Sequence, residues 1–210
     1  MDKDKEMQLF ETATEKLDLY VPSLLKYDHV EDAGKFLEPG GPYVRFAVKQ
    51  FLRELVFELI RPVGEFKEDP NFLDMDPIFE TVKSRLPEHF QVERFLTGYI
   101  YSEFINVTIS DIISLRLKRG TSYHYSILGI QVKGLEDDDD SDWMELVAEE
   151  LDDELLRAEA SGDAGDDDAW FFPDQLNEFF ELVDYVYENH SRHRARAEEK
   201  ARMLREKYGF

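Results

Sequence analysis

Apolar residues recur every three or four positions through the first part of the chain, and this spacing predicts amphipathic helices. The opening helix carries its apolar face at Met7, Phe10, Ala13, Leu17, Tyr20 and Leu24. Pro22 is expected to break or kink this helix. After the turn-forming letters EPGG, Pro42 suits a first helical turn, and residues 42–61 carry only narrow polar rows. We expect this second helix to lie at the centre of the core.

The middle of the chain is also expected to be mainly helical. The letters DPIFE indicate a helix that begins at Asp76 and ends at Pro87. In residues 88–119 the spacing of apolar positions favours two packed helices. Only residues 123–132 alternate in the manner of a strand, with a slip near Gly129. One strand needs a partner, which must come from a second copy of the chain or from an unrecognised strand.

Residues 136–168 hold seventeen carboxylates and one arginine, a net charge of −16 in a chain whose total is −22. Within this segment, Asp142 and Glu145 form a capping-box pattern for a helix over 142–160. Its apolar stripe consists of Trp143, Leu146, Val147, Leu151, Leu155 and Ala158. The acidic, Gly-containing flanks read as extended linkers. We therefore expect an amphipathic helix on acidic tethers.

The last segment predicts one long helix that begins near Pro173. Its first half carries an apolar face, whereas residues 190–207 are polar nearly all round and have a net charge of +4. We expect the first half to pack on the core and the second half to form a projecting basic arm. The basic residues of this arm that we expect to contact partners are Arg192, Arg194, Arg196 and Lys200.

These patterns predict a mainly α fold: a helical bundle with one short strand or extended arm, a tethered acidic amphipathic helix and a long C-terminal helix. The expected domains are a helical core over 1–135, the acidic linker–helix–linker segment over 136–168, and the C-terminal helix over 169–210.

The chain has no cysteine, which excludes disulfides and thiolate chemistry. Without a signal-peptide pattern or a membrane-length apolar run, we expect a cytoplasmic protein with no membrane contact.

Few residues suggest catalysis, and we expect no metal and no cofactor. His190 and His193 are close enough in sequence to share a metal, but solvated histidines in a charged helix are the simpler interpretation. Arg119 and His124 have the R-x4-H spacing that HEPN-type ribonucleases use when a 2′-hydroxyl attacks the neighbouring phosphate. Those enzymes place both residues on a helix, whereas Gly120 and its neighbours are poor helix formers.

Three interpretations of the acidic segment remain open. In the first, it is a solvated linker whose helix covers a groove of its own core. In the second, the apolar stripe enters a groove on a partner protein while the carboxylates face a basic rim. In the third, the carboxylates imitate nucleic-acid phosphates, or they compete with nucleic acid for the basic arm.

The sequence thus predicts a non-catalytic interaction or structural subunit of a larger assembly, either a viral connector-type subunit or an accessory of a nucleic-acid machine. The expected partners are proteins with a basic rim, within a homo-oligomer or a hetero-complex. No extended basic and aromatic patch marks a nucleic-acid surface, and the C-terminal arm is the one basic cluster in the sequence through which nucleic acid could bind. The alternatives are a HEPN-like, metal-independent ribonuclease and a nucleic-acid-mimicking inhibitor.

Overall fold

The computed structural model describes residues 1–26, 29–60, 73–97, 102–120, 126–132, 141–151 and 169–210. These residues divide into two compact units. The helical unit contains the described residues within 1–55, 141–151 and 189–210, and the sheet unit those within 56–132 and 169–188. Helices α3 (Pro42–Leu59) and α7 (Leu176–Tyr208) contribute residues to both.

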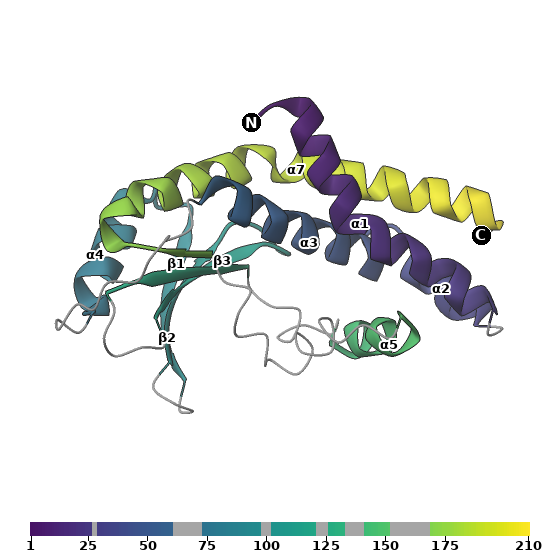
Figure 1. The fold of residues 1–210 in the computed structure, drawn as a ribbon, viewed down its shortest axis with the longest axis horizontal. Helices are drawn as coiled ribbons and strands as arrows, with labels where there is room; N and C mark the ends of the chain where they lie inside the picture. Colours follow the sequence, from purple (N-terminus) through teal and green to yellow (C-terminus); the bar gives the residue numbers. More distant parts are fainter. Residues whose placement is uncertain (27–28, 61–72, 98–101, 121–125, 133–140, 152–168) are drawn as a thin grey trace. The chain divides into compact units, whose positions relative to one another are not determined.

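The helical unit is built from α1 (Lys3–Lys26), α2 (Val30–Phe36), α5 (Ser141–Leu151) and its parts of α3 and α7 (Figure 1). Aromatic rings fill its centre: the ring of Phe36 lies 4.8 Å from that of Tyr20 and 5.8 Å from that of Tyr43. All three side chains are fully buried. Edge-to-face packing of such rings adds to the stabilisation from apolar burial.

The opening helix is confirmed, and so is most of its predicted apolar face, although Met7 is 45% exposed. Phe10, Leu17 and Leu24 of α1 are buried. Pro22 lies inside α1, which continues to Lys26, so the predicted break does not occur. Proline is tolerated here because Val21 and Leu24, on either side of it, are held in the core of the helical unit.

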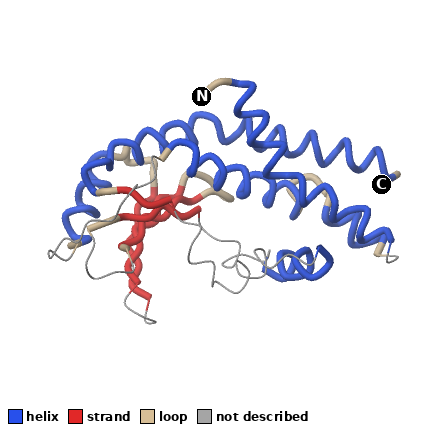
Figure 2. The backbone as a smooth tube through the Cα atoms, in the orientation of Figure 1, coloured by secondary structure: helices blue, strands red, loops and turns tan. Residues whose placement is uncertain are grey.

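The sheet unit contains a five-stranded antiparallel sheet in which each strand pairs with the next along the chain (Figure 2). The strands are β1 (Gln91–Thr97), β2 (Ser102–Thr108), β3 (Ser114–Arg119), β4 (Leu128–Val132) and β5 (Ala169–Phe171). The pairing places Ile105 opposite Leu117, Leu117 opposite Ile130 and Ile130 opposite Ala169. All four are buried, so they define an apolar inner face.

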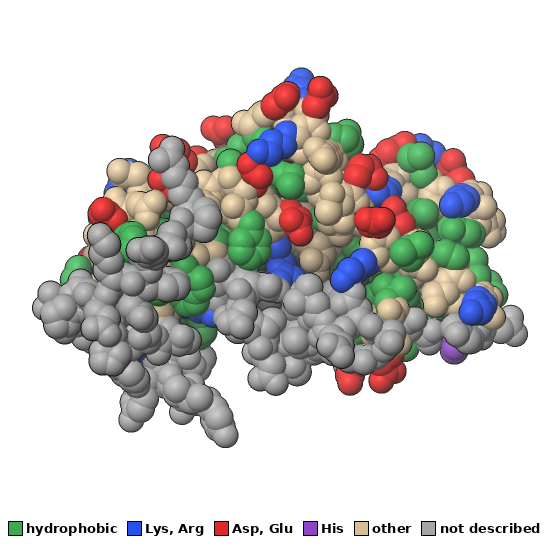
Figure 3. Space-filling view, in the orientation of Figure 1, with side chains coloured by type: hydrophobic (Ala, Val, Ile, Leu, Met, Phe, Trp, Pro, Cys, Tyr) green, Lys and Arg blue, Asp and Glu red, His purple; other side chains and the backbone are tan. Residues whose placement is uncertain are grey.

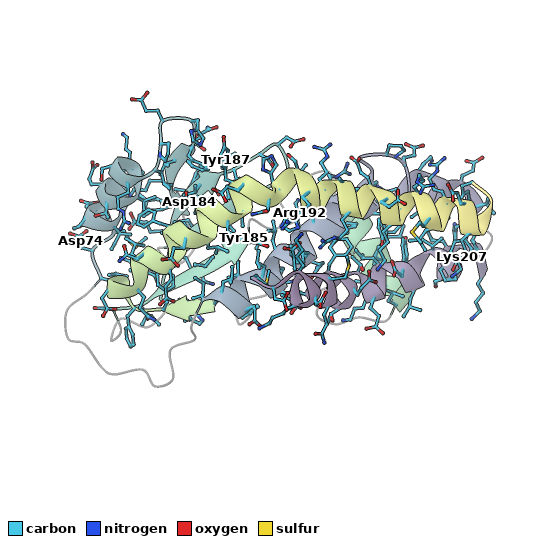
Figure 4. All side chains as sticks on the ribbon, turned by 90° about the horizontal axis from the view of Figure 1, so that it is seen from above. Asp74, Asp184, Tyr185, Tyr187, Arg192 and Lys207 are labelled. Atoms are coloured by element: carbon cyan, nitrogen blue, oxygen red, sulfur yellow. The ribbon has the colours of Figure 1, made fainter. Side chains whose placement is uncertain are left out.

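Helices cover this inner face. The beginning of α7 lies over the sheet in Figure 1, and its residues Phe179, Leu182, Val183 and Val186 are buried. Helix α4 (Met75–Arg85) is tied to the same stretch of α7, because the Arg85 guanidinium lies 4.2 Å from the centre of the Phe180 ring. The ring of Tyr187, labelled in Figure 4, packs edge to face against that of Phe90, just before β1, with 5.0 Å between ring centres.

The start of α4 differs by two residues from the predicted start. Asp74, labelled in Figure 4, is the N-cap, and its Oδ1 accepts a hydrogen bond from the backbone nitrogen of Asp76 at 3.0 Å. The carboxylate of Asp76 instead pairs with Arg94 of β1, which also contacts the buried Glu103 of β2. The helix ends before Pro87, as predicted.

The predicted fold class is wrong. Residues 88–119, expected to form two helices, supply strands β1, β2 and β3, so the chain is not a helical bundle with one short strand. The strand predicted near 123–132 exists as β4, and its neighbours β3 and β5 come from the same chain. The error arose because β-branched residues at mixed spacing fit a helical period, although their side chains favour the pleated sheet.

Candidate functional site

The outer face of the sheet, opposite the apolar inner face, carries a row of aromatic and cationic residues that crosses all five strands. Pairing places Phe95 opposite Phe104 and Phe104 opposite Lys118. Lys118 is opposite Gly129, and Gly129 is opposite Trp170. Because directly paired residues point to the same side of a sheet, these five form one transverse row, which we call the aromatic row.

Gly129 allows the Trp170 indole to lie over the sheet. A Cβ atom at Gly129 would stand 3.0 Å from Cζ3 of Trp170 and 3.2 Å from Cγ of Lys118. The ammonium nitrogen of Lys118 lies 5.1 Å from the centre of the indole ring, which is within the range of a cation–π contact. The missing side chain of Gly129 therefore brings an aromatic plane and a positive charge together at this end of the row.

A second row, which we call the polar row, runs beside the first. It joins Glu93, Asn106, Arg116 and Gln131, which are paired in that order across β1 to β4. The guanidinium of Arg116 lies 5.7 Å from the centre of the Phe104 ring, so the two rows are in contact. Glu93 is the acidic member, at the β1 end of this row.

Asn106 in the polar row is 5% exposed, and its Nδ2 donates to Oγ1 of Thr108 at 3.2 Å. Its Oδ1 is buried and receives no hydrogen bond from any residue that the structure describes. A buried acceptor without a donor costs about 1–3 kcal/mol. Such a group at the centre of a face that also carries aromatic rings is a candidate contact for a ligand that brings a donor.

The charge of this face differs from that of the whole chain. Strand β3 contributes Arg116, Lys118 and Arg119 and has no acidic residue, whereas the whole chain has a net charge of −22. Phe95 is 43% exposed, and Phe104, Arg116, Lys118 and Trp170 are half-buried. Arg94 points to the inner face, where it is paired with Glu103. Among the described residues the cations of the two rows are Arg116 and Lys118, and both make further contacts besides those with the rings.

The residues of the predicted basic arm lie on α7 against α1. Arg192, labelled in Figure 4, donates from Nη2 to Oε2 of the buried Glu6 at 2.6 Å, and Nη2 of Arg196 lies 3.1 Å from Oε1 of the same carboxylate. Arg194 pairs with Glu198 one turn later on α7. On the face drawn in Figure 3, acidic and basic side chains are interspersed.

Lys200 of α7 forms a second cluster with α1. Its Nζ lies 2.7 Å from a Glu11 oxygen and 3.0 Å from a carboxylate oxygen of Asp18. The hydroxyl of the buried Tyr43 donates to the other Asp18 oxygen at 2.6 Å. Burial and the negative charge of Asp18 raise the pKa of Tyr43, so it remains a neutral donor. In this structure Arg192, Arg196 and Lys200 pair with carboxylates of α1, and Arg194 pairs within α7. The role of these four residues in partner binding stays a prediction.

The stripe of the predicted acidic helix is largely turned inward on α5. Val147 is 1% exposed, and the half-buried Trp143 ring lies 5.8 Å from that of Phe36 in the core. Leu151 is half-buried and Leu146 is exposed. Leu155 lies outside the described residues. This packing supports the interpretation in which the helix covers its own core, and the partner-binding role of the stripe stays a prediction.

The two residues of the ribonuclease spacing are not on a described helix. Arg119 is the last residue of β3, and His124 lies outside the described residues. Within the described part of the chain, no group of three His, Asp or Glu side chains is arranged to hold a metal ion. No described helix combines the length and apolar character that a membrane crossing requires.

His193, considered above as a metal ligand, is fully buried beside the ring of Phe51, 4.5 Å between ring centres. Its Nδ1 lies 3.8 Å from Oε1 of Glu6. Burial, aided by the charges of Arg192 and Arg196 and opposed by that of Glu6, lowers the pKa of His193 to about 4. The imidazole is therefore neutral at pH 7 and serves as a core residue of the helical unit.

Sequence reasoning missed the outer face. Its residues come from five separate strands, three of which were interpreted as helix, so no linear pattern joins them. One local signal was present: in the letters SLRLKR, Leu115 and Leu117 alternate with Arg116 and Lys118. Strict alternation of this kind indicates a strand with one apolar and one polar face.

Comparison of the chain with protein-family models, with curated proteins and with solved structures gave no significant match.

Proposed function

We propose that the protein is a non-catalytic subunit of a larger macromolecular assembly and that it binds an anionic partner through the outer face of its sheet. The observation that carries this proposal is the aromatic row, in which Lys118 lies over the Trp170 ring while Arg116 of the neighbouring row lies over that of Phe104. Each cation is held against a ring, so less side-chain freedom is lost when an anion binds.

The net charge of the chain decides how such binding works. A protein at −22 repels other anions at long range, so binding depends on contacts made at short distance. The outer face offers these contacts as two cations, aromatic planes and amide groups on a rigid sheet. Among the two predicted assemblies, an accessory of a nucleic-acid machine fits a face for anions better than a viral connector-type subunit does.

The other predictions from the sequence keep their status as predictions. They are a cytoplasmic location, a homo-oligomer or hetero-complex, contacts through the acidic helix and basic arm, and the nucleic-acid-mimicking inhibitor. A HEPN-like ribonuclease has less support, because Arg119 ends a strand.

The test is affinity isolation from native lysate with matched charge variants. Arg116→Gln with Lys118→Gln removes two cations from the outer face. Arg194→Gln with Arg202→Gln removes two from exposed positions on α7, where they pair with nearby glutamates. Both variants should melt close to the wild type, because none of the four side chains is fully buried.

We expect the wild type and the α7 variant to retain the same partner and the outer-face variant to lose it. Salt should release the partner from the wild type, since exposed ionic contacts are screened. Equal recovery of partners by the outer-face variant and the wild type would refute the proposal.

A further inference from the structure

We infer that the anionic partner is a single-stranded nucleic acid whose bases stack on the aromatic row and whose base edges reach the polar row. This inference rests on the proposed function and names the partner of the same face. Three observations support it: the arrangement of the aromatic rings, the amide groups beside them, and the two cations held against the rings.

The aromatic row is a stacking platform. Phe95 and Phe104 are on adjacent strands, which lie roughly 5 Å apart, and Trp170 is three strands beyond Phe104, roughly 14 Å away along the sheet. Flat sheets with spaced aromatic side chains take unstacked bases one by one, because every base has a π-face. Lys118 stands between Phe104 and Trp170 in the row, where a phosphate linking two stacked bases would pass.

The polar row supplies hydrogen-bonding groups at the edge of such bases. Oδ1 of Asn106 is a buried acceptor that receives no hydrogen bond within the described residues. An exocyclic amino group of a base would provide the missing donor, and Gln131 and Arg116 stand beside it in the row. Asparagine, glutamine and arginine are the side chains that most often read base edges.

Other polyanions would contact fewer kinds of group on this face. In a duplex the bases are already stacked on one another, so the rings of Phe95 and Phe104 would have nothing to stack on. An acidic peptide would pair with Arg116 and Lys118 but would leave the aromatic row and Asn106 without a role. A single strand uses all three kinds of group, so it is the partner that the outer face fits best.

The first experiment is a fluorescence titration of the full chain carrying Trp143→Phe, which leaves Trp170 as the sole tryptophan. The probes are dodecamers of deoxythymidylate, uridylate and adenylate, with a DNA duplex and a poly-glutamate peptide for comparison. We expect the single strands to quench Trp170 and the duplex and peptide to have little effect. Quenching by poly-glutamate at equal or lower concentration would overturn the inference in favour of an acidic protein partner.

Variants then locate the binding. Phe95→Ala should weaken binding about fivefold to a hundredfold, the usual effect of losing one stacked base. It should leave the melting temperature close to that of the wild type, because Phe95 is exposed. With two phosphate contacts to a single strand, a plot of the logarithm of the association constant against the logarithm of the salt concentration should have a slope of about −1.4. Arg116→Gln with Lys118→Gln should bring that slope toward zero, and Arg194→Gln with Arg202→Gln should not change it.

The outcomes separate this inference from the proposed function. If no oligonucleotide binds, yet partner recovery from lysate still depends on Arg116 and Lys118, the inference is wrong and the proposed function stands. If recovery does not depend on those residues either, both are wrong. If oligonucleotides bind but only the α7 variant loses them, the inference is wrong and the basic arm is the nucleic-acid site.

Discussion

Acid is expected to weaken the helical unit through His193, whose environment is set by four charged or titratable neighbours. Glu6 on α1 favours the protonated imidazole, whereas Arg192, Arg196 and His190 on α7 disfavour it. Phe51 of α3 packs its ring against the imidazole and brings no charge. Burial dominates this balance and lowers the pKa of His193 to about 4.

The sign and size of the effect follow from the two states. In the unfolded chain His193 has a pKa near 6.5, so below pH 6.5 the unfolded state binds a proton that the folded state does not. The stability that the folded protein gains by keeping His193 neutral is fully present above pH 6.5 and is lost as the pH falls toward 4. The loss is about 1.4 kcal/mol per pH unit in the free energy of unfolding, or about 3 kcal/mol over the whole window.

The assay is urea unfolding at pH 7, 5.5 and 4.5, followed by the fluorescence of Trp143 in a Trp170→Phe background. Trp143 lies against Phe36 in the helical unit, so its emission reports on that unit. His193→Gln removes the titrating group and keeps a polar side chain. The carboxylates are the same in both proteins, so the difference between their pH dependences reports on His193 together with its coupling to Glu6.

We expect the wild type to lose stability more steeply than His193→Gln between pH 6.5 and 4.5. Parallel pH dependences for the two proteins would refute the reasoning. They would mean that the imidazole of His193 reaches water in the folded state.

Three further predictions concern separate parts of the protein. Glu6→Gln removes the buried negative charge that pairs with two arginines and replaces one acceptor oxygen with an amide NH2. It should lower the free energy of unfolding by about 2–4 kcal/mol in urea, since the half-exposed Arg192 can regain water; a loss below about 1 kcal/mol would show that the pairs contribute little. Gly129→Ala places a methyl group against the Trp170 indole, so it should shift the Trp170 emission and cost about 1–3 kcal/mol; unchanged emission would contradict the contact. A non-catalytic protein should not cleave RNA in the presence of a chelator, whereas cleavage lost on Arg119→Ala or His124→Ala would establish the ribonuclease alternative.

Local sequence patterns were sufficient to predict an element where its own apolar spacing indicates one type of secondary structure. The face of α1 and the strand β4 were predicted because a single helical or alternating period describes each of them. Strands β1 to β3 were missed because their apolar residues also fit a helical period, and only the partner strands select the extended form. Helix α5 was predicted, but the side on which it packs depends on residues of α1 and α2 that are distant in sequence.

The candidate site was beyond local reasoning for the same physical reason. Phe95, Lys118 and Trp170 become neighbours through strand register alone, and register is fixed by burial of the inner face rather than by the residues of the outer face. The basic arm was correctly seen as positively charged, yet its charge is matched by Glu6, Glu11 and Asp18 of α1. Such pairing between distant helices leaves no trace in either segment alone.

Photocrosslinking in native lysate would show whether the outer face of the sheet is the surface that binds a partner. Phe95→p-benzoylphenylalanine places the crosslinker on the exposed outer face, and Met203→p-benzoylphenylalanine places it at a similarly exposed position on α7. If the outer face binds the partner, we expect a crosslinked partner from position 95 and none from position 203. Adducts from position 203 alone, or from neither position, would contradict it.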